Sequence, residues 1–407
     1  MTLELTAGDE AMLAGEEGEG VALAMRVLVA TAEAMGAERL LDITSAHVDG
    51  CLYHGPSGLD FARALVSGGA RVKVPTTLNV SSLDLLHPEL VRLDRATAEQ
   101  ARALMDTYVE LGCRPTWTCA PYQLPERPKL GEQVAWGESN AIVFANSVLG
   151  ARTERYGDFL DISAAVTGRA PAVGLHTDEG RLPTLVVAAD ELTDDLAANE
   201  ALYPLLGHVL GRVADSHVAA ITGLPSAADE DDLKALGAAA ASSGSVAMFH
   251  AVGLTPEAPD PSDLADLETV TVTREMIAEA RNDLGAGEGE RVDAVCVGTP
   301  HYSRRQLERL LDRLQGRRCA IPLYVNTSRH ALQEFGRVAD LEAAGVRVVT
   351  DTCTYITPVL DDGIEVVMTD SAKWAYYAPA NLGVRVVFAS TDACVESAVA
   401  GSSVATW

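Results

Sequence analysis

The feature that most limits the fold is a pattern repeated along the last third of the chain. Four times, a run rich in β-branched residues is followed by a polar turn, at residues 296–303, 326–329, 351–358 and 369–373. Stretches with helical periodicity lie between these runs, as in RRQLERLLDRLQG after the first turn. Alternating strands and helices are typical of a parallel sheet covered by helices, in which the strands end at one edge. The pattern therefore predicts an α/β fold whose polar turns lie together.

The same alternation continues, with shorter strands, through the earlier part of the chain. LLDITSAH predicts a strand, DGCLYHGPSG a glycine-rich loop and LDFARALVSGG a helix. The strand RVKV leads into a predicted polar loop at 76–79, and RPTWTC is predicted as a strand that ends at Cys119. EAPDPSDLADLE, rich in Pro and Asp, is predicted to be a linker. We therefore expect three α/β domains, at 1–150, 151–265 and 266–407.

Charge and hydropathy argue against several classes of function. The 407 residues carry a formal net charge of −27, which argues against nucleic-acid binding as the main task. No stretch approaches the ~18 apolar residues that cross a membrane. The acidic start MTLELTAGDEAML does not resemble a signal peptide, so a cytoplasmic protein is expected. Lysine occurs only four times, which fits either a salt-adapted cytoplasm or a genome that encodes Arg in place of Lys.

Cysteine is the residue type that points most directly to a cofactor. The seven cysteines are scattered and form no CxxC motif, so buried thiols or metal ligands are expected in place of disulfides. Cys119, Cys296 and Cys353 lie at ends of predicted strands, each with a proline nearby. Thiolates are the usual ligands of iron–sulfur clusters, but a buried thiol of an α/β core is the alternative for each. That structural role is expected for Cys51, Cys113, Cys319 and Cys394.

Other polar residues stand where ligands bind in such folds. Lys373 lies at a predicted helix start, where it could bind a carboxylate or phosphate, with a surface lysine as the alternative. Glu138, which precedes Ser139 and Asn140, is predicted to begin a helix, either as a carboxylate stabilised by the helix dipole or as an acid–base group. His301 could be an acid, a ligand partner or a capping group, but a structural histidine is the simplest interpretation.

Several of these motifs together resemble one known family. They are SAHVDG, PTTLNV, CAPYQ, GESNAIVFANSVLGART, AAVTGRAPAVGLH, VGTPHYS, TDSAKWAYY and CVESAVAG, with DTC followed by Pro358. Over nearly its whole length, the chain resembles the large, catalytic subunit of the aconitase X group in the aconitase superfamily. The resemblance implies a multi-domain α/β protein with parallel sheets flanked by helices and an active site in an inter-domain cleft. It also implies an iron-dependent hydro-lyase, that is, a dehydratase.

The resemblance assigns roles to residues of this sequence. It implies that Cys119, Cys296 and Cys353 bind an iron–sulfur cluster, either 4Fe–4S or smaller. Thr299 is an alternative alignment point for Cys296; without that thiolate, a smaller cluster or a single iron with help from Glu138 is implied. The implied catalytic residues are Lys373 and Glu138. The residues implied to contact substrate are Gly50, Cys51, Leu52, Asn79, Val80, Ser139, Asn140 and Lys373.

The resemblance leaves the substrate open between two small hydroxy acids. One reaction associated with the family converts cis-3-hydroxy-L-proline to 1-pyrroline-2-carboxylate, and the other converts 5-phosphomevalonate to trans-anhydromevalonate 5-phosphate. In the phosphomevalonate enzymes, a proline follows the asparagine that matches Asn79, whereas this chain has Val80, which favours the hydroxyproline reaction.

The partner implied by the resemblance is a small subunit. Family members have a small swivelling domain, for which this sequence has no region, so a separate subunit that supplies a serine base is implied. Separate subunits favour the phosphomevalonate type, but the hydroxyproline enzyme is our preferred prediction. The alternative from another class is a non-catalytic binding or scaffold subunit that has lost its cluster.

Overall fold

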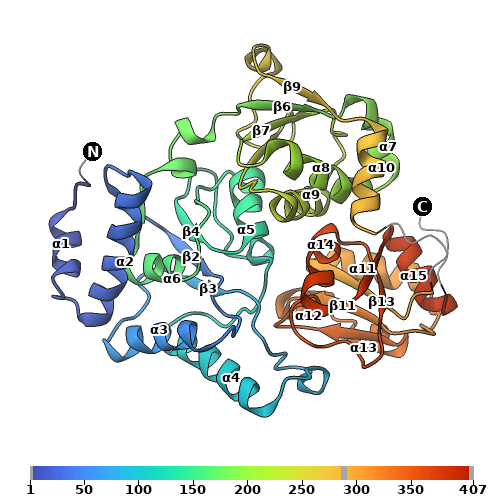
Figure 1. Ribbon diagram of the computed structural model, residues 1–407, viewed down its shortest axis with the longest axis horizontal. Coiled ribbons are helices and arrows are strands. Elements are labelled where there is room, and N and C mark those ends of the chain that lie inside the picture. The colour runs from blue at the N-terminus through green and yellow to red at the C-terminus, as the bar shows by residue number, and fades with distance from the viewer. Residues whose placement is uncertain (1–2, 286–290, 403–407) are drawn as a thin grey trace. The chain divides into compact units, whose positions relative to one another are not determined.

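The computed structural model describes residues 3–285 and 291–402, and the chain divides into two compact units (Figure 1). The first unit consists of Met1–Leu83 and Leu93–Leu182, and the second of Asp84–Arg92 and Pro183–Trp407. The chain thus leaves the first unit for one short segment and then returns. Both units contain parallel strands flanked by helices, which confirms the predicted α/β fold. Among the described residues, no helix is both long and apolar enough to cross a membrane.

The first unit is built on a three-stranded parallel sheet. Its strand order is β3 (Thr76–Leu78), β2 (Ser45–Val48) and β4 (Val134–Trp136). An antiparallel pair joins β1 (Leu40–Asp42) to β5 (Arg169–Pro171). Because β5 pairs with β1, residues 151–182 fold with the first unit. The boundary expected at residue 150 therefore moves to residue 182.

Helices surround this sheet, and one of them begins at a predicted site residue. The helices are α1 (Ala7–Leu13), α2 (Glu19–Met35), α3 (Pro56–Ser67), α4 (Arg95–Glu110), α5 (Ser139–Phe144) and α6 (Leu160–Thr167). Glu138 is the N-cap of α5, because its carboxylate accepts a hydrogen bond from the Ala141 N–H at 2.9 Å. The helix start predicted at Glu138 is thus confirmed.

Three local expectations in the first unit are wrong. The stretch RVKV at residues 71–74 forms no strand, and the chain becomes a strand only at Thr76. Residues 76–78 form strand β3, although a polar loop was expected there. Thr76 and Thr77 are β-branched, and pairing with β2 overrides the polar character that suggested a loop. The strand expected to end at Cys119 is only an isolated bridge between Arg114 and Thr77.

The second unit contains a four-stranded parallel sheet. Its order is β8 (Phe249–Ala251), β7 (Ala219–Thr222), β6 (Leu185–Ala188) and β9 (Thr269–Thr271), flanked by α7 (Thr193–Ala198), α8 (Leu202–Ala214), α9 (Glu230–Ser243) and α10 (Arg274–Asp283). Leu264, within the stretch expected to be a linker, is buried against Val186 and Ala220. That stretch therefore connects two strands of one sheet, and the boundary expected at residue 265 moves beyond α10.

A five-stranded parallel sheet completes the second unit. Its order is β12 (Val346–Val349), β11 (Leu323–Thr327), β10 (Ala294–Tyr302), β13 (Val366–Thr369) and β14 (Arg385–Phe388). Buried residues of α11 (Arg304–Leu314), α12 (Arg329–Phe335), α13 (Val338–Ala343) and α15 (Thr391–Ala400) pack in one apolar cluster with the sheet. Trp374 and Ala378 of α14 (Ala372–Leu382) pack in another. Because β10, β11, β12 and β13 are parallel strands of one sheet, the polar turns predicted at 326–329, 351–358 and 369–373 share one edge, as expected. The turn predicted at 296–303 is wrong in its placement, because β10 continues to Tyr302.

Candidate active-site residues

A thiol lies beside an imidazole at the carboxyl edge of the five-stranded sheet. Cys353 is in the loop after β12, and His301 is near the end of β10. The Sγ atom of Cys353 is 3.8 Å from Nε2 of His301, which also lies 3.2 Å from the carbonyl oxygen of Thr352. Burial lowers the pKa of His301 to about 4, so its ring is neutral at physiological pH. Thiolate and neutral imidazole are both ligands that iron accepts.

The structure supports His301 as a candidate metal ligand more strongly than the sequence did. A structural histidine was the simplest reading of the motif VGTPHYS. The available signal was its place at the end of a strand, since ligand-binding groups gather at that edge of a parallel sheet. What the sequence could not show is that the loop after β12 brings Cys353 to the same ring.

Cys296 lies deeper in the sheet than expected. The prediction that it stands at a strand end is wrong, because β10 runs on to Tyr302. Cys296 is paired with Tyr324 and Thr369 on the two neighbouring strands and belongs to an apolar cluster. Burial raises the pKa of its thiol to about 12. These surroundings suit a buried core thiol, and its role as a metal ligand stays a prediction.

The loop that carries Cys353 is held by a network of neutral side chains. The Asn326 amide donates to the Thr354 hydroxyl at 3.0 Å, and its oxygen accepts from the Thr354 N–H at 3.0 Å. The indole N–H of Trp374 donates to the same hydroxyl at 3.0 Å. All three side chains are fully buried. Thr354 is thereby fixed, and with it the adjacent Cys353.

Lys373 occupies the first turn of α14, whose N-cap is Ser371, so the predicted helix start is confirmed. Its side chain is buried, which excludes the alternative of a surface lysine. It lines a cavity of about 40 Å³ together with Lys234, Thr299 and Asp370. A buried ammonium at the sheet edge suits the predicted contact with a substrate carboxylate.

Carboxylates join the loops that follow the strands of the first unit. The Asn79 amide, after β3, donates to the carboxylate of Asp49, after β2. Asp161, near the start of α6, accepts from the Asp49 N–H at 2.6 Å. A Cβ at Gly137, after β4, would lie only 2.5 Å from the Asp161 carboxylate, so this position requires glycine. Burial raises the pKa of Asp161 to about 8.

The predicted substrate residues around Asp49 differ in exposure. Cys51 is buried, its thiol donates to the Val48 carbonyl at 3.4 Å, and burial raises its pKa well above the ordinary range. Gly50 and Leu52 are partly exposed, whereas Val80 is buried. The structure therefore brings Gly50, Cys51 and Asn79 to one place through Asp49. Their contacts with substrate stay predictions.

A second network in the first unit surrounds the main chain at Cys119. The Asn140 amide donates to the Cys119 carbonyl at 3.0 Å and also to the Glu138 carboxylate. The Tyr122 hydroxyl donates to the Asn140 oxygen at 2.6 Å, and Ser139 donates to Glu138 at 3.2 Å. The structure thus assembles Cys119, Glu138, Ser139 and Asn140 as one group. They are residues that sequence reasoning had placed at a single site.

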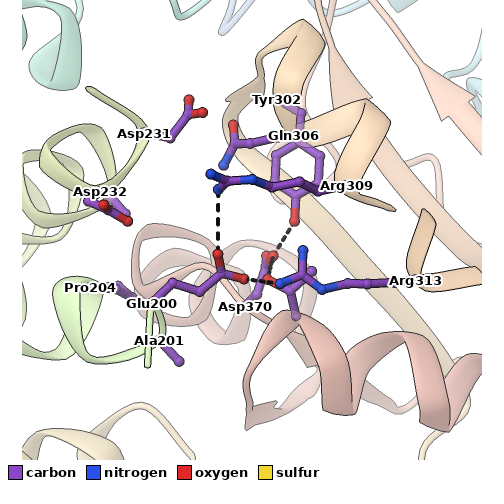
Figure 2. A pocket seen from close by; sticks show the side chains of 12 residues that line it. Glu200, Ala201, Pro204, Asp231, Asp232, Tyr302, Gln306, Arg309, Arg313 and Asp370 are labelled. Atoms are coloured by element: carbon purple, nitrogen blue, oxygen red, sulfur yellow. Dashed lines mark hydrogen bonds and ion pairs between the residues drawn. The ribbon is translucent and has the colours of Figure 1, made fainter. Parts of the chain in front are cut away.

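A cavity elsewhere in the second unit contains none of the predicted residues. It has a volume of about 60 Å³ and lies among α8, α9 and α11 (Figure 2). Arg313 of α11 donates to Glu200 at 2.6 Å, and the Tyr302 hydroxyl donates to the Asp370 carboxylate. Arg309 lies 3.6 Å from Glu200. The two arginines thus join α11 to the turn between α7 and α8, so the cavity lies at a structural junction within the second unit.

Comparison with known proteins identifies the family. Three family models match in succession: the Aconitase X first domain at residues 2–179, the second at 183–282 and the third at 292–400. The chain belongs to the aconitase X family. The matched ranges agree with the division after residue 182 and with the placement of β9 and α10 beside the four-stranded sheet.

Curated relatives of this aconitase X chain are dehydratases. A cis-3-hydroxy-L-proline dehydratase from Pseudomonas aeruginosa is 44% identical, with the match covering 98% of this chain and 70% of that protein. The enzyme of the same name from Hypocrea jecorina is 40% identical, covering 98% and 69%. A phosphomevalonate dehydratase large subunit from Methanothermobacter thermautotrophicus is 39% identical, covering 93% and 95%.

A solved structure confirms the fold of the aconitase X chain. The crystal structure of Thermococcus kodakaraensis aconitase X, in its holo form, is 31% identical and matches with a TM-score of 0.87. The match covers 97% of this chain and 100% of that one. The predicted fold and family are both confirmed.

The residues present fit the iron that such a family suggests. Aconitase-like proteins use thiolates for iron–sulfur binding, and this chain places the Cys353 thiol and the His301 ring within reach of one ion. Both side chains are buried, so a bound ion would be shielded from water. These two donors are compatible with a bound metal ion.

Proposed function

We propose that this chain is the catalytic part of an iron-dependent dehydratase whose substrate is cis-3-hydroxy-L-proline. Two dehydratases of that name match 98% of the chain at 44% and 40% identity. Val80, in place of the proline of the phosphomevalonate enzymes, supports the same choice. The observation that carries the proposal is the Cys353–His301 pair, because it gives the chain a metal-binding group at a sheet edge.

The proposed ligands are cysteines and one histidine. Cys119 and Cys353 would bind the metal, with His301 beside Cys353 and Cys296 as the further predicted ligand. When bound, an iron–sulfur cluster or single iron would supply Lewis-acid chemistry toward the substrate hydroxyl. Support for Cys119 comes from Asn140, which fixes the main chain at that residue.

The proposed work of the other residues is to bind and orient the hydroxy acid. The Lys373 ammonium would pair with the substrate carboxylate, and N–H groups near Gly50 and Ser139 would donate to it. Removal of the proton next to the carboxylate and loss of the hydroxyl as water together form a carbon–carbon double bond. Loss of the nitrogen proton and protonation of the adjacent ring carbon then convert this enamine to the C=N bond of 1-pyrroline-2-carboxylate. Glu138 is proposed as an acid–base group, placed by Asn140 and Ser139.

A separate small subunit is proposed as the partner. The phosphomevalonate relatives are named large subunits, and this chain covers 95% of the one from Methanothermobacter. About a third of each hydroxyproline relative has no counterpart in this chain, since the matches cover 70% and 69%. By the resemblance, the partner would supply a serine base.

The proposed function is tested with anaerobically purified protein, alone and mixed with its small subunit. We expect iron and sulfide in the protein, and dehydration of cis-3-hydroxy-L-proline only in the mixture. Turnover of 5-phosphomevalonate instead would establish the second candidate, which the 95% coverage of a large subunit favours. Colourless, iron-free and inactive mixtures would show a non-catalytic subunit.

A further inference from the structure

The segment Asp84–Arg92 belongs to the second unit although the chain on both sides of it belongs to the first. It begins just after the predicted substrate residues Asn79 and Val80. A short 3₁₀ turn, Pro88–Leu90, is its only regular structure. Since so brief an excursion has little core of its own, its position depends on what it contacts. Its main hydrogen bonds to other parts of the chain go to the loop that carries Cys353.

The first end of the segment is attached where that loop begins. The buried Asp84 carboxylate accepts from the Thr350 N–H at 2.7 Å and from the Thr350 hydroxyl at 2.8 Å. It also accepts from the Leu86 and His87 N–H groups, both at 2.9 Å. Burial alone would raise the pKa of Asp84, yet hydrogen bonds from His87 and Thr350 keep it below the ordinary value. The carboxylate therefore stays charged and links the two chain segments.

The next residue of the loop is attached as well. Asp351 is fully buried, and its φ of 58° is in the left-handed region that residues other than glycine rarely adopt. Its carboxylate accepts from Arg329 Nε at 2.7 Å and Nη2 at 2.5 Å, and from the Leu85 N–H at 3.0 Å. A strained conformation persists only where its surroundings impose it. Arg329 and Leu85 supply that constraint.

The second end of the segment is attached where the loop ends. The Arg92 N–H donates to the Pro358 carbonyl at 2.9 Å, and its guanidinium pairs with Asp361. Leu90 and Val91 pack against the apolar cluster that contains Val359. The segment thus brackets the loop, with contacts at Thr350 and Asp351 on one side of Cys353 and at Pro358 on the other.

We propose that Asp84–Arg92 is a clamp that positions Cys353 and its neighbour His301, with Asp84 as the main positioning residue. The part of this inference that concerns metal rests on the proposed function. Asp84 does not touch iron or substrate in this role; it acts through Thr350 and the loop. Because a partner of a ligand loop usually affects metal affinity about 10- to 100-fold, loss of the clamp should weaken iron binding without abolishing folding.

The first test measures thiol reactivity in metal-free protein, so it does not depend on iron. The variant is Asp84→Asn, which cannot accept both Thr350 donors. We expect alkylation of Cys353 by iodoacetamide, mapped by mass spectrometry, to be about tenfold faster than in the unmodified chain. Cys296 of β10 and Cys394 of α15, both buried in the same unit, report global unfolding and should keep their rates. Equal rates at Cys353 would overturn the clamp.

A matched control and a second variant make the result specific. Like Asp84→Asn, the variant Asp9→Asn removes a buried carboxylate that accepts hydrogen bonds from the main chain. Asp9 belongs to the capping box of α1 in the first unit, so this variant should leave Cys353 protected. If Asp84→Asn does not fold, the variant Arg329→Lys is measured in its place. It keeps the positive charge but loses the bidentate ion pair with Asp351. It should speed the Cys353 reaction a few-fold, and an unchanged rate would contradict the proposal.

The second test measures iron. In anaerobically loaded protein, Asp84→Asn should release iron to a chelator about tenfold faster than Asp9→Asn and show a changed visible spectrum. An unmodified chain that binds no iron would refute the proposed function while the thiol test still decides the clamp. Iron binding with equal release from both variants would refute the clamp alone.

Discussion

The carboxyl edges of the three-stranded and five-stranded sheets are organised by different chemistry. In the three-stranded sheet, Asp49 and Asp161 join the loops after the strands, and Glu138 organises the group near Cys119. At the five-stranded edge, the network around Cys353 is neutral and consists of Asn326, Thr354 and Trp374. Buried acids therefore join the loops of the first edge directly. Neutral groups hold the residues next to Cys353, and the buried carboxylates Asp84 and Asp351 act where that loop begins.

The two kinds of network should respond differently to pH. Hydrogen bonds between neutral groups keep their geometry across a wide range of pH, so they suit a thiol and an imidazole that must stay in place for a metal. Buried carboxylates change their hydrogen bonding when they gain or lose a proton, so an edge built from them responds to pH.

The largest expected effect is at the neutral edge. Cys353→Ser should lose iron, and activity should fall at least about 100-fold, because a serine hydroxyl does not replace a thiolate toward iron. The measurements are iron and sulfide content and turnover with the small subunit. Cys319→Ser, at a half-buried cysteine of the same unit, should behave as the unmodified chain. Full iron and activity in Cys353→Ser would remove the cluster assignment.

The next effect concerns the acidic edge. Glu138→Gln should lower kcat about 100-fold if the carboxylate takes part in proton transfer, as proposed. Stability should change little, because the glutamine oxygen can still accept from the Ala141 N–H that caps α5. Turnover and melting temperature measured on the same sample separate the two roles. Unchanged turnover would show that Glu138 only caps its helix.

A third effect is a dependence of stability on pH. Burial raises the pKa of Asp161 from 3.8 to about 8, so the folded state holds a proton that the unfolded state releases. Its stabilising contribution is complete below pH ~4 and is lost as the pH rises toward ~8, at about 1.4 kcal/mol per pH unit.

The variant Asp161→Asn tests this slope. Urea unfolding across that range should show a smaller fall in the free energy of unfolding for the variant than for the unmodified chain. Asp158→Asn, which changes an exposed carboxylate nearby, should keep the original slope. Identical slopes in all three proteins would mean that Asp161 does not carry the pH response of the acidic edge.

The smallest effect is expected in the neutral network. Thr354→Val keeps the shape of the side chain but removes the hydroxyl that accepts from Asn326 and Trp374. The free energy of unfolding should fall by about 1–3 kcal/mol, by the same amount at every pH between ~5 and ~8. A loss that grows with pH would contradict the neutral character of the network formed by Asn326, Thr354 and Trp374.

The sequence was most informative where strands are rich in apolar β-branched residues. The turns after β11, β12 and β13 were predicted correctly, so Cys353 and Lys373 were expected at the edge where they lie, whereas the turn predicted at 296–303 lies mostly within β10. It was less informative in the first unit, where the main strands have only three or four residues and β3 was taken for a loop. β3 was missed because Thr76 and Thr77 are polar, although their β-branched side chains suit a strand.

The sequence also could not show how deep within a sheet a given residue lies. Cys296 was expected at a strand end because polar residues follow it, yet β10 continues through them to Tyr302. His301 was taken as structural, because nothing in its own motif shows that a thiol from the loop after β12 lies 3.8 Å away. Both differences arise from pairing between strands that are distant in the chain.

By itself, the sequence determined the α/β class, the family resemblance and the edge at which the polar turns meet, because periodicity and strand endings are local properties of the chain. Tertiary structure alone decided which of those turns are rigid. The bonds from Asp84 to Thr350 and from Leu85 to Asp351 join residues 266 positions apart. The local pattern of neither segment predicts such a contact, because it forms only when distant parts of the second unit fold together.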